Sequence, residues 1–244
     1  RMPDNERLML HTAGSLALAD ASRLEAVAYV TPALVATEHH FQRGVLDALT
    51  LLLVTRVDRQ PVHAAGVARE DVALLLAGPS GVGKSTVAYA AARAGYRLIS
   101  DDVVYVQLSP SLRVWGLGRS IVLLPEAREH FPEAHGYPEV RRLDGARKII
   151  VEAGNGWSSG AAPFAERAGI CLLERDERCS LERLTPAAMV EHLVSRLDPG
   201  FDRFAPTIAD AIQRVADRGA WRLRLSGSPP TCIPYIDRMV TELA

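Results

Sequence analysis

The chain has 244 residues, 48% of them hydrophobic, which is long enough to bury a sizeable core in one large domain or in one domain with a small appendage. Its formal net charge of −1 lacks the clustered basic excess typical of proteins that bind nucleic acid or acidic membranes, so we expect neither partner. The cysteines are odd in number and lack C-x-x-C spacing, which disfavours a disulfide framework or a zinc site and favours a reducing, cytoplasmic location.

The amino-terminal segment predicts a layer of short strands and one helix. Strands are expected at Leu16–Leu18 and Leu24–Val30, and Pro32 is expected to break the chain after them. From Phe41 to Val54 apolar residues recur at helical spacing, so this segment predicts a helix packed against a core. The apolar part of that segment is too short to span a bilayer, and we expect no membrane helix.

Two apolar segments with a charged turn between them predict a strand hairpin. The segment Pro61–Val67 is followed by the turn Arg69–Asp71 and then by the continuous apolar run Val72–Ala77, as expected of a buried parallel strand. The hairpin would place His63 close to the loop that follows the second strand. Taken alone, a histidine in this setting is more often a core residue with its hydrogen bonds satisfied internally.

The second strand leads directly into a complete G-x-x-x-x-G-K-[ST] motif, which is typical of a phosphate-binding loop. The motif and its following residue are Gly78, Pro79, Ser80, Gly81, Val82, Gly83, Lys84, Ser85 and Thr86. The glycines allow positive φ angles, so that successive N–H groups form an anion site at the start of a helix. Lys84 is expected to reach the β- and γ-phosphates of ATP, and the Ser85 hydroxyl to ligate Mg²⁺. A glycine turn that binds nothing is the alternative, and the strand–helix context disfavours it.

Two adjacent aspartates, Asp101 and Asp102, follow the short apolar strand Leu98–Ile99, and Gly95 before it is expected to end the loop helix. Ligands of open α/β sheets gather at the carboxyl ends of strands, so the two carboxylates are expected near the phosphates. One could hold Mg²⁺ while the other accepts a proton from an attacking hydroxyl. An ordinary solvated turn is the alternative, since paired aspartates are common in turns.

Taken together, these residues resemble the catalytic core of HPr kinase/phosphorylase. The resemblance rests on His63, the loop from Gly78 to Ser85 and the pair Asp101–Asp102, which occur in the same order and at similar separations. Gly116-Leu117-Gly118 resembles the Gly-Leu-Gly element that follows in that family, and Arg147 resembles a basic position near its phosphoacceptor region. The strong part of the resemblance covers a minor part of the chain.

The resemblance implies an α/β fold with a mixed sheet, of the type found in the carboxyl-terminal P-loop domain of HPr kinase, with flanking helices. It implies transfer of the ATP γ-phosphoryl group to a serine hydroxyl, with Asp101 as the base and His63 in support. Asp102 and Ser85 would lie at the metal, and Arg147 would contact the substrate. A homo-oligomer is a further expectation, because the kinases that the chain resembles assemble into rings.

The chain departs from the family in two respects. Where the family has an acidic residue and then an arginine just before its Gly-Leu-Gly, this chain has Arg113 and Trp115, so one metal-side carboxylate is missing. The amino-terminal part is also too short and too different to match the family's accessory domain, so HPr is not the expected acceptor. Short kinases of this type resemble enzymes of peptide-tailoring pathways, including those that phosphorylate a lasso-peptide precursor.

The remainder of the chain predicts further elements around the core. Strands are expected at Ser120–Leu124, Gly169–Glu174 and Trp221–Leu225, helices at Thr185–Leu197, Ile208–Arg218 and Ile236–Leu243, and a loop at Gly154–Pro163. Several basic residues in this half form either a peptide-docking face or, as the favoured interpretation, a solvated rim. They are Arg196, Arg203, Arg214, Arg218, Arg222 and Arg224.

The sequence thus predicts an amino-terminal layer at residues 1–60 packed on a kinase-like domain at residues 61–244. The expected activity depends on ATP and Mg²⁺, and the expected partner is a protein or peptide with an acceptor serine. A kinase of a small hydroxylated metabolite, a phosphorylase activity and a nucleotide-binding switch without transfer remain alternatives. The phosphate loop does not distinguish ATP from GTP.

Overall fold

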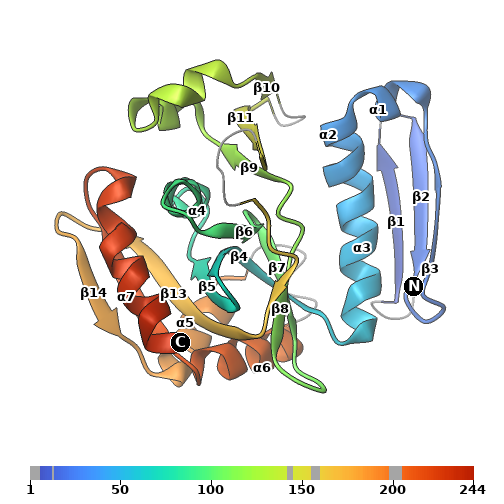
Figure 1. Cartoon of the computed structure of the whole chain (residues 1–244). Helices are drawn as coiled ribbons and strands as arrows, with labels where there is room; N and C mark the ends of the chain where they lie inside the picture. The colour runs from blue at the N-terminus through green and yellow to red at the C-terminus, as the bar shows by residue number, and fades with distance from the viewer. Residues whose placement is uncertain (1–5, 13, 142–144, 155–159, 198–204) are drawn as a thin grey trace.

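A large mixed sheet carries the phosphate loop and is covered by helices on both faces (Figure 1). The computed structural model describes residues 6–12, 14–141, 145–154, 160–197 and 205–244. Within these residues nine strands form the main sheet, in the order β12-β8-β7-β4-β5-β13-β15-β14 with β6 paired to β4. Two smaller sheets have the orders β1-β2-β3 and β10-β11-β9. The predicted α/β fold class with a mixed sheet is confirmed.

The strands and helices lie as follows along the chain. The strands are β1 (Arg7–Thr12), β2 (Ser15–Asp20), β3 (Glu25–Tyr29), β4 (Gln60–Arg69), β5 (Val72–Ala77), β6 (Arg97–Ser100), β7 (Val103–Gln107), β8 (Arg113–Trp115), β9 (Ser120–Leu123), β10 (Glu139–Arg141), β11 (Arg147–Glu152), β12 (Phe164–Ala165), β13 (Arg167–Arg175), β14 (Ser180–Arg183) and β15 (Ala220–Leu225). The helices are α1 (Pro32–Ala36), α2 (Glu38–Phe41), α3 (Asp47–Val54), α4 (Lys84–Arg93), α5 (Pro186–Val194), α6 (Ala205–Ala216) and α7 (Ile233–Leu243), with a π-helix η1 (Gln42–Leu46) and the 3-10 helices η2 (Thr55–Val57), η3 (Pro125–Glu129), η4 (Pro132–Gly136) and η6 (Pro229–Cys232).

The centre of the main sheet consists of strands that are buried on both faces. β4 and β5 form the predicted antiparallel hairpin, and Glu70 turns the chain between them with a φ of 54°. β13 runs parallel to β5, with Gly169 opposite Leu74 and Leu172 opposite Ala77. Both β5 and the middle of β13 are fully buried, which explains their continuous apolar sequences.

Two sets of helices cover the sheet, as Figure 1 shows. α4, α7 and the small β10-β11-β9 sheet pack on one face, where Tyr89, Phe131 and Met239 join the same buried cluster. α5 and α6 pack on the other face, and α6 presents Ile208 and Ile212 to it. The predicted helices in this half are confirmed, although α6 and α7 each begin about a turn earlier than expected. Every helix in the described part of the chain is too short or too polar to cross a membrane.

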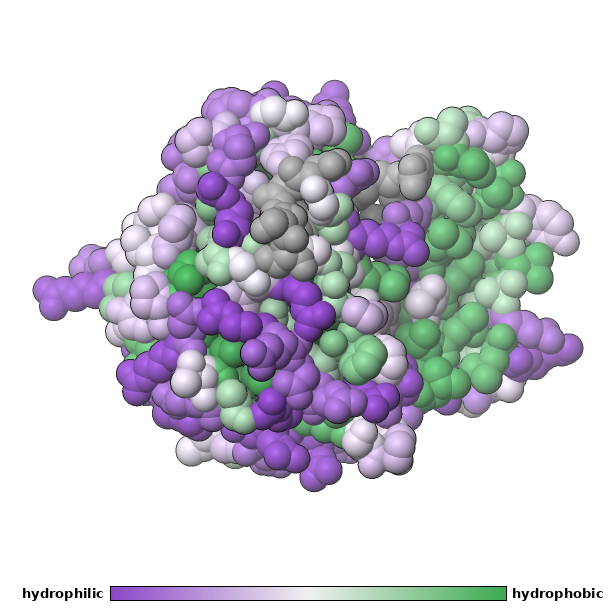
Figure 2. Space-filling model, viewed as in Figure 1, coloured by the Kyte–Doolittle hydropathy of each residue, from purple (hydrophilic) through white to green (hydrophobic). Residues whose placement is uncertain are grey.

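The amino-terminal segment builds a small unit with a hydrophobic cluster of its own. The β1-β2-β3 sheet packs on α3 and the helical turns before it, and Ala17, Leu34 and Leu49 lie in this cluster. The predicted break of the chain at Pro32 is confirmed, since β3 ends at Tyr29, but Pro32 is also the first residue of a short helix that was not predicted. Thr31 caps this helix, α1, by accepting a hydrogen bond from the Leu34 N–H. Hydrophobic surface gathers over this unit on its outer side (Figure 2). The division at residue 60 stays a prediction.

The Gly-Leu-Gly element lies against β6 at very short range. A Cβ on Gly116 would lie 2.2 Å from the carbonyl oxygen of Ile99, and one on Gly118 would lie 2.3 Å from that of Leu98. Only glycine allows the two backbones to approach so closely. The element therefore packs directly against the strand that leads into the two aspartates.

Of the predicted loop Gly154–Pro163, residues 155–159 lie outside the described residues.

Replacing Gly116 with alanine is expected to destabilise the fold by about 3 kcal/mol, because the new methyl group would collide with backbone that cannot move aside. Gly136→Ala is the matched control, since nothing lies within 4 Å of a Cβ at that position and its side of η4 is exposed. The control is expected to change stability by less than about 0.5 kcal/mol. Urea unfolding followed by circular dichroism measures both, and equal midpoints for the two variants would contradict the close approach.

Candidate active site

The phosphate loop lies between β5 and α4 and has the geometry that its sequence predicts. Gly78, Gly81 and Gly83 have φ angles of 143°, 80° and 116°, all in the region that glycine tolerates. Gly78 also packs so tightly on β13 that a Cβ there would lie 2.8 Å from the Leu173 carbonyl oxygen. The first turn of α4 thus begins at a loop whose backbone is fixed by the neighbouring strand.

Lys84 is held inside this loop. It is 7% exposed, and its Nζ donates hydrogen bonds to the carbonyl oxygens of Gly78 at 2.8 Å and Pro79 at 3.2 Å. The ammonium therefore lies against the backbone of the loop, close to where a phosphate-binding lysine is expected. Val82 points the other way, into the core beneath α4.

Asp101 and Asp102 occupy a gap between two strands that pair with the same neighbour. β6 and β7 both run antiparallel to β4, with Gly66 opposite Ser100 and His63 opposite Val103. The two aspartates lie between these paired segments, beyond the carboxyl end of β6. Because β6 and β5 run in the same direction, this end is on the same edge of the sheet as the phosphate loop. The Ser85 Oγ donates to the Asp101 carbonyl oxygen at 3.4 Å, which joins the loop to the aspartates.

The two carboxylates have different surroundings. Asp101 is 6% exposed, and its Oδ2 accepts a hydrogen bond of 2.8 Å from the backbone N–H of Val122. The side chain of Asp102 is 48% exposed, and its Oδ1 lies 3.4 Å from Nε2 of His63. One carboxylate is therefore oriented by backbone at depth, while the other lies nearer the solvent with an imidazole beside it.

A cleft of about 520 Å³ brings these groups together. It is lined by His40, Gly44, His63, Ser80, Gly81, Gly83, Lys84, Ser85, Thr86, Asp101, Asp102, Val122, Leu124, Glu126, Ala127, His130, Lys148, Arg175 and Pro229. The structure thus places every predicted catalytic and metal-binding residue in one cavity. Three units form its walls: the phosphate-loop edge of the main sheet, the β10-β11-β9 sheet with η3, and the amino-terminal unit.

Arg147 lies apart from the cleft lining. Its side chain is 70% exposed and its Nη1 lies 3.2 Å from Oε1 of Glu139. The next residue, Lys148, lines the cleft instead, because successive side chains of β11 point to opposite faces of the strand. The substrate-binding role of Arg147 stays a prediction, and Lys148 is the basic residue of this strand that the structure brings to the site.

The sequence reasoning missed several cleft residues. Arg175, Glu126 and Lys148 were not singled out, and neither was Gly44 of the amino-terminal unit. Arg175 ends β13, the strand beside β5, so the rule that places ligands at carboxyl ends of strands could have found it. The others come from elements whose position depends on tertiary packing, and no local motif marks them.

Arg113 stands where the resembled family has an acidic residue, and its positive charge is paired within the protein. The Arg113 guanidinium lies 2.7 Å from Oε1 of Glu166 and over the ring of Phe164. This residue sits on β8, outside the lining of the cleft. Trp115, two residues on, donates a hydrogen bond from its ring N–H to Gln107.

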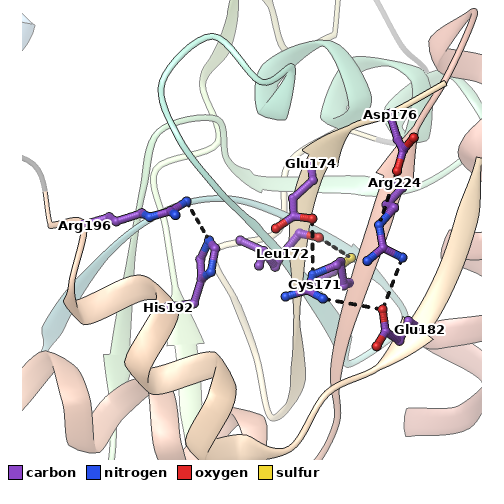
Figure 3. Close-up of polar contacts among 9 residues, drawn as sticks. Cys171, Leu172, Glu174, Asp176, Glu182, His192, Arg196 and Arg224 are labelled. Atoms are coloured by element: carbon purple, nitrogen blue, oxygen red, sulfur yellow. Dashed lines mark hydrogen bonds and ion pairs between the residues drawn. The ribbon is translucent and has the colours of Figure 1, made fainter.

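A network of ion pairs neutralises part of the basic set near the carboxyl terminus (Figure 3). Arg222 lies within ion-pair distance of Glu174 and Glu182, and Arg224 of Asp176 and Glu182. These pairs across β13, β15 and β14 suit the favoured interpretation of a solvated rim for the two arginines, and the peptide-docking face stays an untested alternative. Of the remaining basic residues of that set, Arg203 lies outside the described residues.

Comparison with known proteins gives partial matches. No protein-family model matches the chain. Among curated proteins, the chain is similar to the replication factor C large subunits of Pyrococcus abyssi (34% identical over 134 residues) and Pyrococcus horikoshii (33% over 128 residues). The matches cover 50% and 46% of this chain but 26% and 27% of those proteins, so the chain spans about a quarter of the length of these relatives.

Among solved structures, the fold is similar to the Hpr(Ser) kinase/phosphatase from Coxiella burnetii. The match has a TM-score of 0.39 and 12% sequence identity, and it covers 73% of this chain and 94% of that one. That structure carries the name of the family that the sequence resembles. A likeness of this score says nothing of the reaction, which has to be inferred from the residues of the cleft.

The two buried cysteines, Cys171 and Cys232, are poorly suited to act as nucleophiles. Burial raises the pKa of the Cys171 thiol far above its ordinary range, and it raises the pKa of Cys232 to about 12. The Cys232 Sγ donates to the carbonyl oxygen of Pro229. Cys179 is partly exposed.

Thiol labelling is therefore expected to distinguish these residues. At pH 8 a disulfide reagent should react rapidly with Cys179 and slowly with the two buried thiols, because thiolate formation and access are both suppressed in the core. All three should react at once in guanidinium. In a Cys179→Ser variant the rapid phase should disappear, and its persistence would show that the core is open.

Proposed function

We propose that this protein is an ATP-dependent kinase that transfers the γ-phosphoryl group to a serine hydroxyl of a protein or peptide. The observation that carries the proposal is the meeting of the phosphate loop with two carboxylates and a histidine in one cleft. The hydrogen bond from Ser85 to the Asp101 backbone and the contact of His63 with Asp102 connect these groups. A glycine turn that bound nothing would have no use for such a set.

The phosphate loop supplies the groups that would bind the ATP phosphates and the positive charge that would offset theirs. Its N–H groups and the Lys84 ammonium would hold the phosphates of ATP, in the arrangement common to P-loop enzymes. The hydroxyl of Ser85 and the carboxylate of Asp102 are the oxygen donors that would hold Mg²⁺, and they suit a hard cation that keeps several waters. When bound, Mg²⁺ supplies neutralisation of the charge on the β- and γ-phosphates.

Asp101 is the proposed base. The hydrogen bond from Val122 orients the carboxylate through Oδ2, and the carboxylate would accept the proton of the attacking hydroxyl. In the transfer step the serine oxygen forms a bond to the γ-phosphorus, its proton passes to Asp101, and the bond to the β–γ bridging oxygen breaks to release ADP. His63 beside Asp102 would keep the second carboxylate oriented.

The reaction and its residues can be tested together. Purified protein is incubated with γ-labelled ATP and Mg²⁺ and with serine peptides, including lasso-precursor-type peptides, and with HPr for comparison, followed by mass spectrometry of the products. The Asp101→Asn variant should still bind ATP, but its rate of phosphoryl transfer should fall by about a hundredfold or more, because the asparagine side chain cannot accept the proton of the serine hydroxyl. Lys84→Ala should lose both, and Asp102→Asn should raise the Mg²⁺ concentration needed.

Asp210→Asn serves as the control for these variants, because this aspartate is exposed on α6 and lies outside the cleft lining. Turnover at the wild-type rate by Asp101→Asn would remove it as the base. Transfer to a small hydroxylated metabolite but to no peptide would keep the kinase and change its acceptor class. Transfer of the phosphoryl group from a phosphorylated peptide to added inorganic phosphate, which forms pyrophosphate and restores the serine hydroxyl, would reveal a phosphorylase.

The amino-terminal unit is the proposed acceptor side of the cleft. Gly44 lines the cleft from η1, and nothing lies within 4 Å of a Cβ at this position. A bulky side chain there would extend into the cleft opposite the phosphate loop. This placement suggests that the acceptor enters between the amino-terminal unit and the β10-β11-β9 sheet.

Gly44→Trp is therefore expected to lower transfer to the acceptor by roughly tenfold or more while leaving the affinity for ATP unchanged. Leu46→Trp is the control, since Leu46 is exposed two residues away and does not line the cleft. Steady-state kinetics with the acceptor varied, together with calorimetric binding of ATP, separate the two effects. Equal transfer by both variants would place the acceptor elsewhere.

A nucleotide-dependent switch is the second candidate, and similarity to replication factor subunits is compatible with it. The similar region covers about a quarter of those proteins, and the formal charge of −1 provides no basic excess for contact with DNA. Tight nucleotide binding with no acceptor-dependent rate would favour the switch over the kinase.

A further inference from the structure

Arg175 is a cationic side chain at the phosphate loop that the proposed reaction does not yet use. It ends β13, the strand whose residues Gly169 to Leu172 pair in parallel with β5, so it lies beyond the pairing and alongside the loop. A Cβ on Gly83 would lie 3.1 Å from its Nη2, which places the guanidinium in contact with the last glycine of the loop. It also lines the cleft.

Strand alternation explains why this arginine faces the loop. Leu173 belongs to the cluster on the α4 face, so Arg175, two residues on, points to the same face. Its neighbours Glu174 and Asp176 point to the opposite face, where they pair with Arg222 and Arg224 (Figure 3). The acids that flank Arg175 in sequence are thus directed away from it.

Within the described residues, the charge of Arg175 is not neutralised by an ion pair. In the part of the chain that the structure describes, it forms no hydrogen bond or ion pair with another residue, and it is exposed to the cleft. By contrast, Arg222 and Arg224 on the adjacent strand are each paired with two carboxylates. A guanidinium left without an acid beside a phosphate loop suits an anionic ligand, since its planar set of donors matches phosphate oxygens.

We infer that Arg175 binds the α- and β-phosphates of the nucleotide and acts as a second cationic clamp opposite Lys84. The inference rests on the nucleotide binding of the proposed function. The α,β position follows from the contact with Gly83, because the loop N–H groups near the start of the helix cradle those phosphates while the lysine reaches the β- and γ-phosphates. ADP and ATP share this part of the molecule, so Arg175 contributes equally to both.

Binding of ADP and of a non-hydrolysable ATP analogue to the full chain, measured by calorimetry with Mg²⁺ present, tests the assignment. Arg175→Ala is expected to weaken both ligands by a similar factor, about tenfold or more, as for loss of a charge-assisted hydrogen bond. Arg175→Lys should restore part of the affinity, which a purely structural role would not predict. Arg178→Ala is the control, because this arginine is exposed in the following turn and lies outside the cleft lining.

The outcomes separate this inference from the proposed function. Unchanged affinity in Arg175→Ala would overturn the assignment of Arg175, and loss for the ATP analogue alone would overturn the α,β position. Wild-type protein that binds ADP but transfers no phosphate would contradict the kinase and leave the role of Arg175 standing. Wild-type protein that binds neither ligand would overturn both.

Discussion

Backbone pairing on both edges of β4 determines where the chemistry can take place. One edge pairs with β5, which ends in the phosphate loop, and the other pairs first with β6 and then with β7. The second edge leaves Asp101 and Asp102 between its two partners, and β4 itself carries His63. A shift of the β4 register by one residue would turn His63 to the other face and separate it from Asp102. The Gly-Leu-Gly element supports this arrangement from behind, because it holds β6 in place at backbone contact distance.

Charge is distributed differently on the two faces of β13. On the α5 and α6 side, Glu174 and Asp176 join arginines of β15 in a closed set of ion pairs (Figure 3). On the α4 side, Arg175 extends beside the loop and forms no ion pair with any residue that the structure describes. Alternation along a single strand thus places balanced charge where no ligand is expected and an unbalanced positive charge where the proposed phosphates lie. Exposed ion pairs of the first kind add little stability, whereas a cation at a phosphate site can contribute much to binding.

The sequence was most informative where a function constrains several neighbouring residues. The loop from Gly78 to Thr86, the hairpin before it and the position of the aspartates at a strand end all followed from local pattern, and the structure has them as expected. The sequence could not show whether Arg147 or Lys148 faces the cleft. Two adjacent basic residues on a strand point to opposite faces, and which face lines a cavity depends on how the strand packs. Pro32 marks the end of the strand region as expected, but the pattern of a threonine followed by a proline also begins a helix, and only the structure shows that this helix forms. Gly44 and His130 reach the cleft only through packing between distant elements, which no local pattern records.

The amino-terminal unit buries a cluster of its own, formed by residues such as Ala17 and Leu49, while the main sheet is buried between two other clusters. A unit whose interior is separate can change its surface with little cost to the stability of the sheet that holds the phosphate loop. The same unit supplies one wall of the cleft. Mutations in the amino-terminal unit could therefore change which molecules enter the cleft during evolution. The phosphate loop and the sheet that carries it would stay the same.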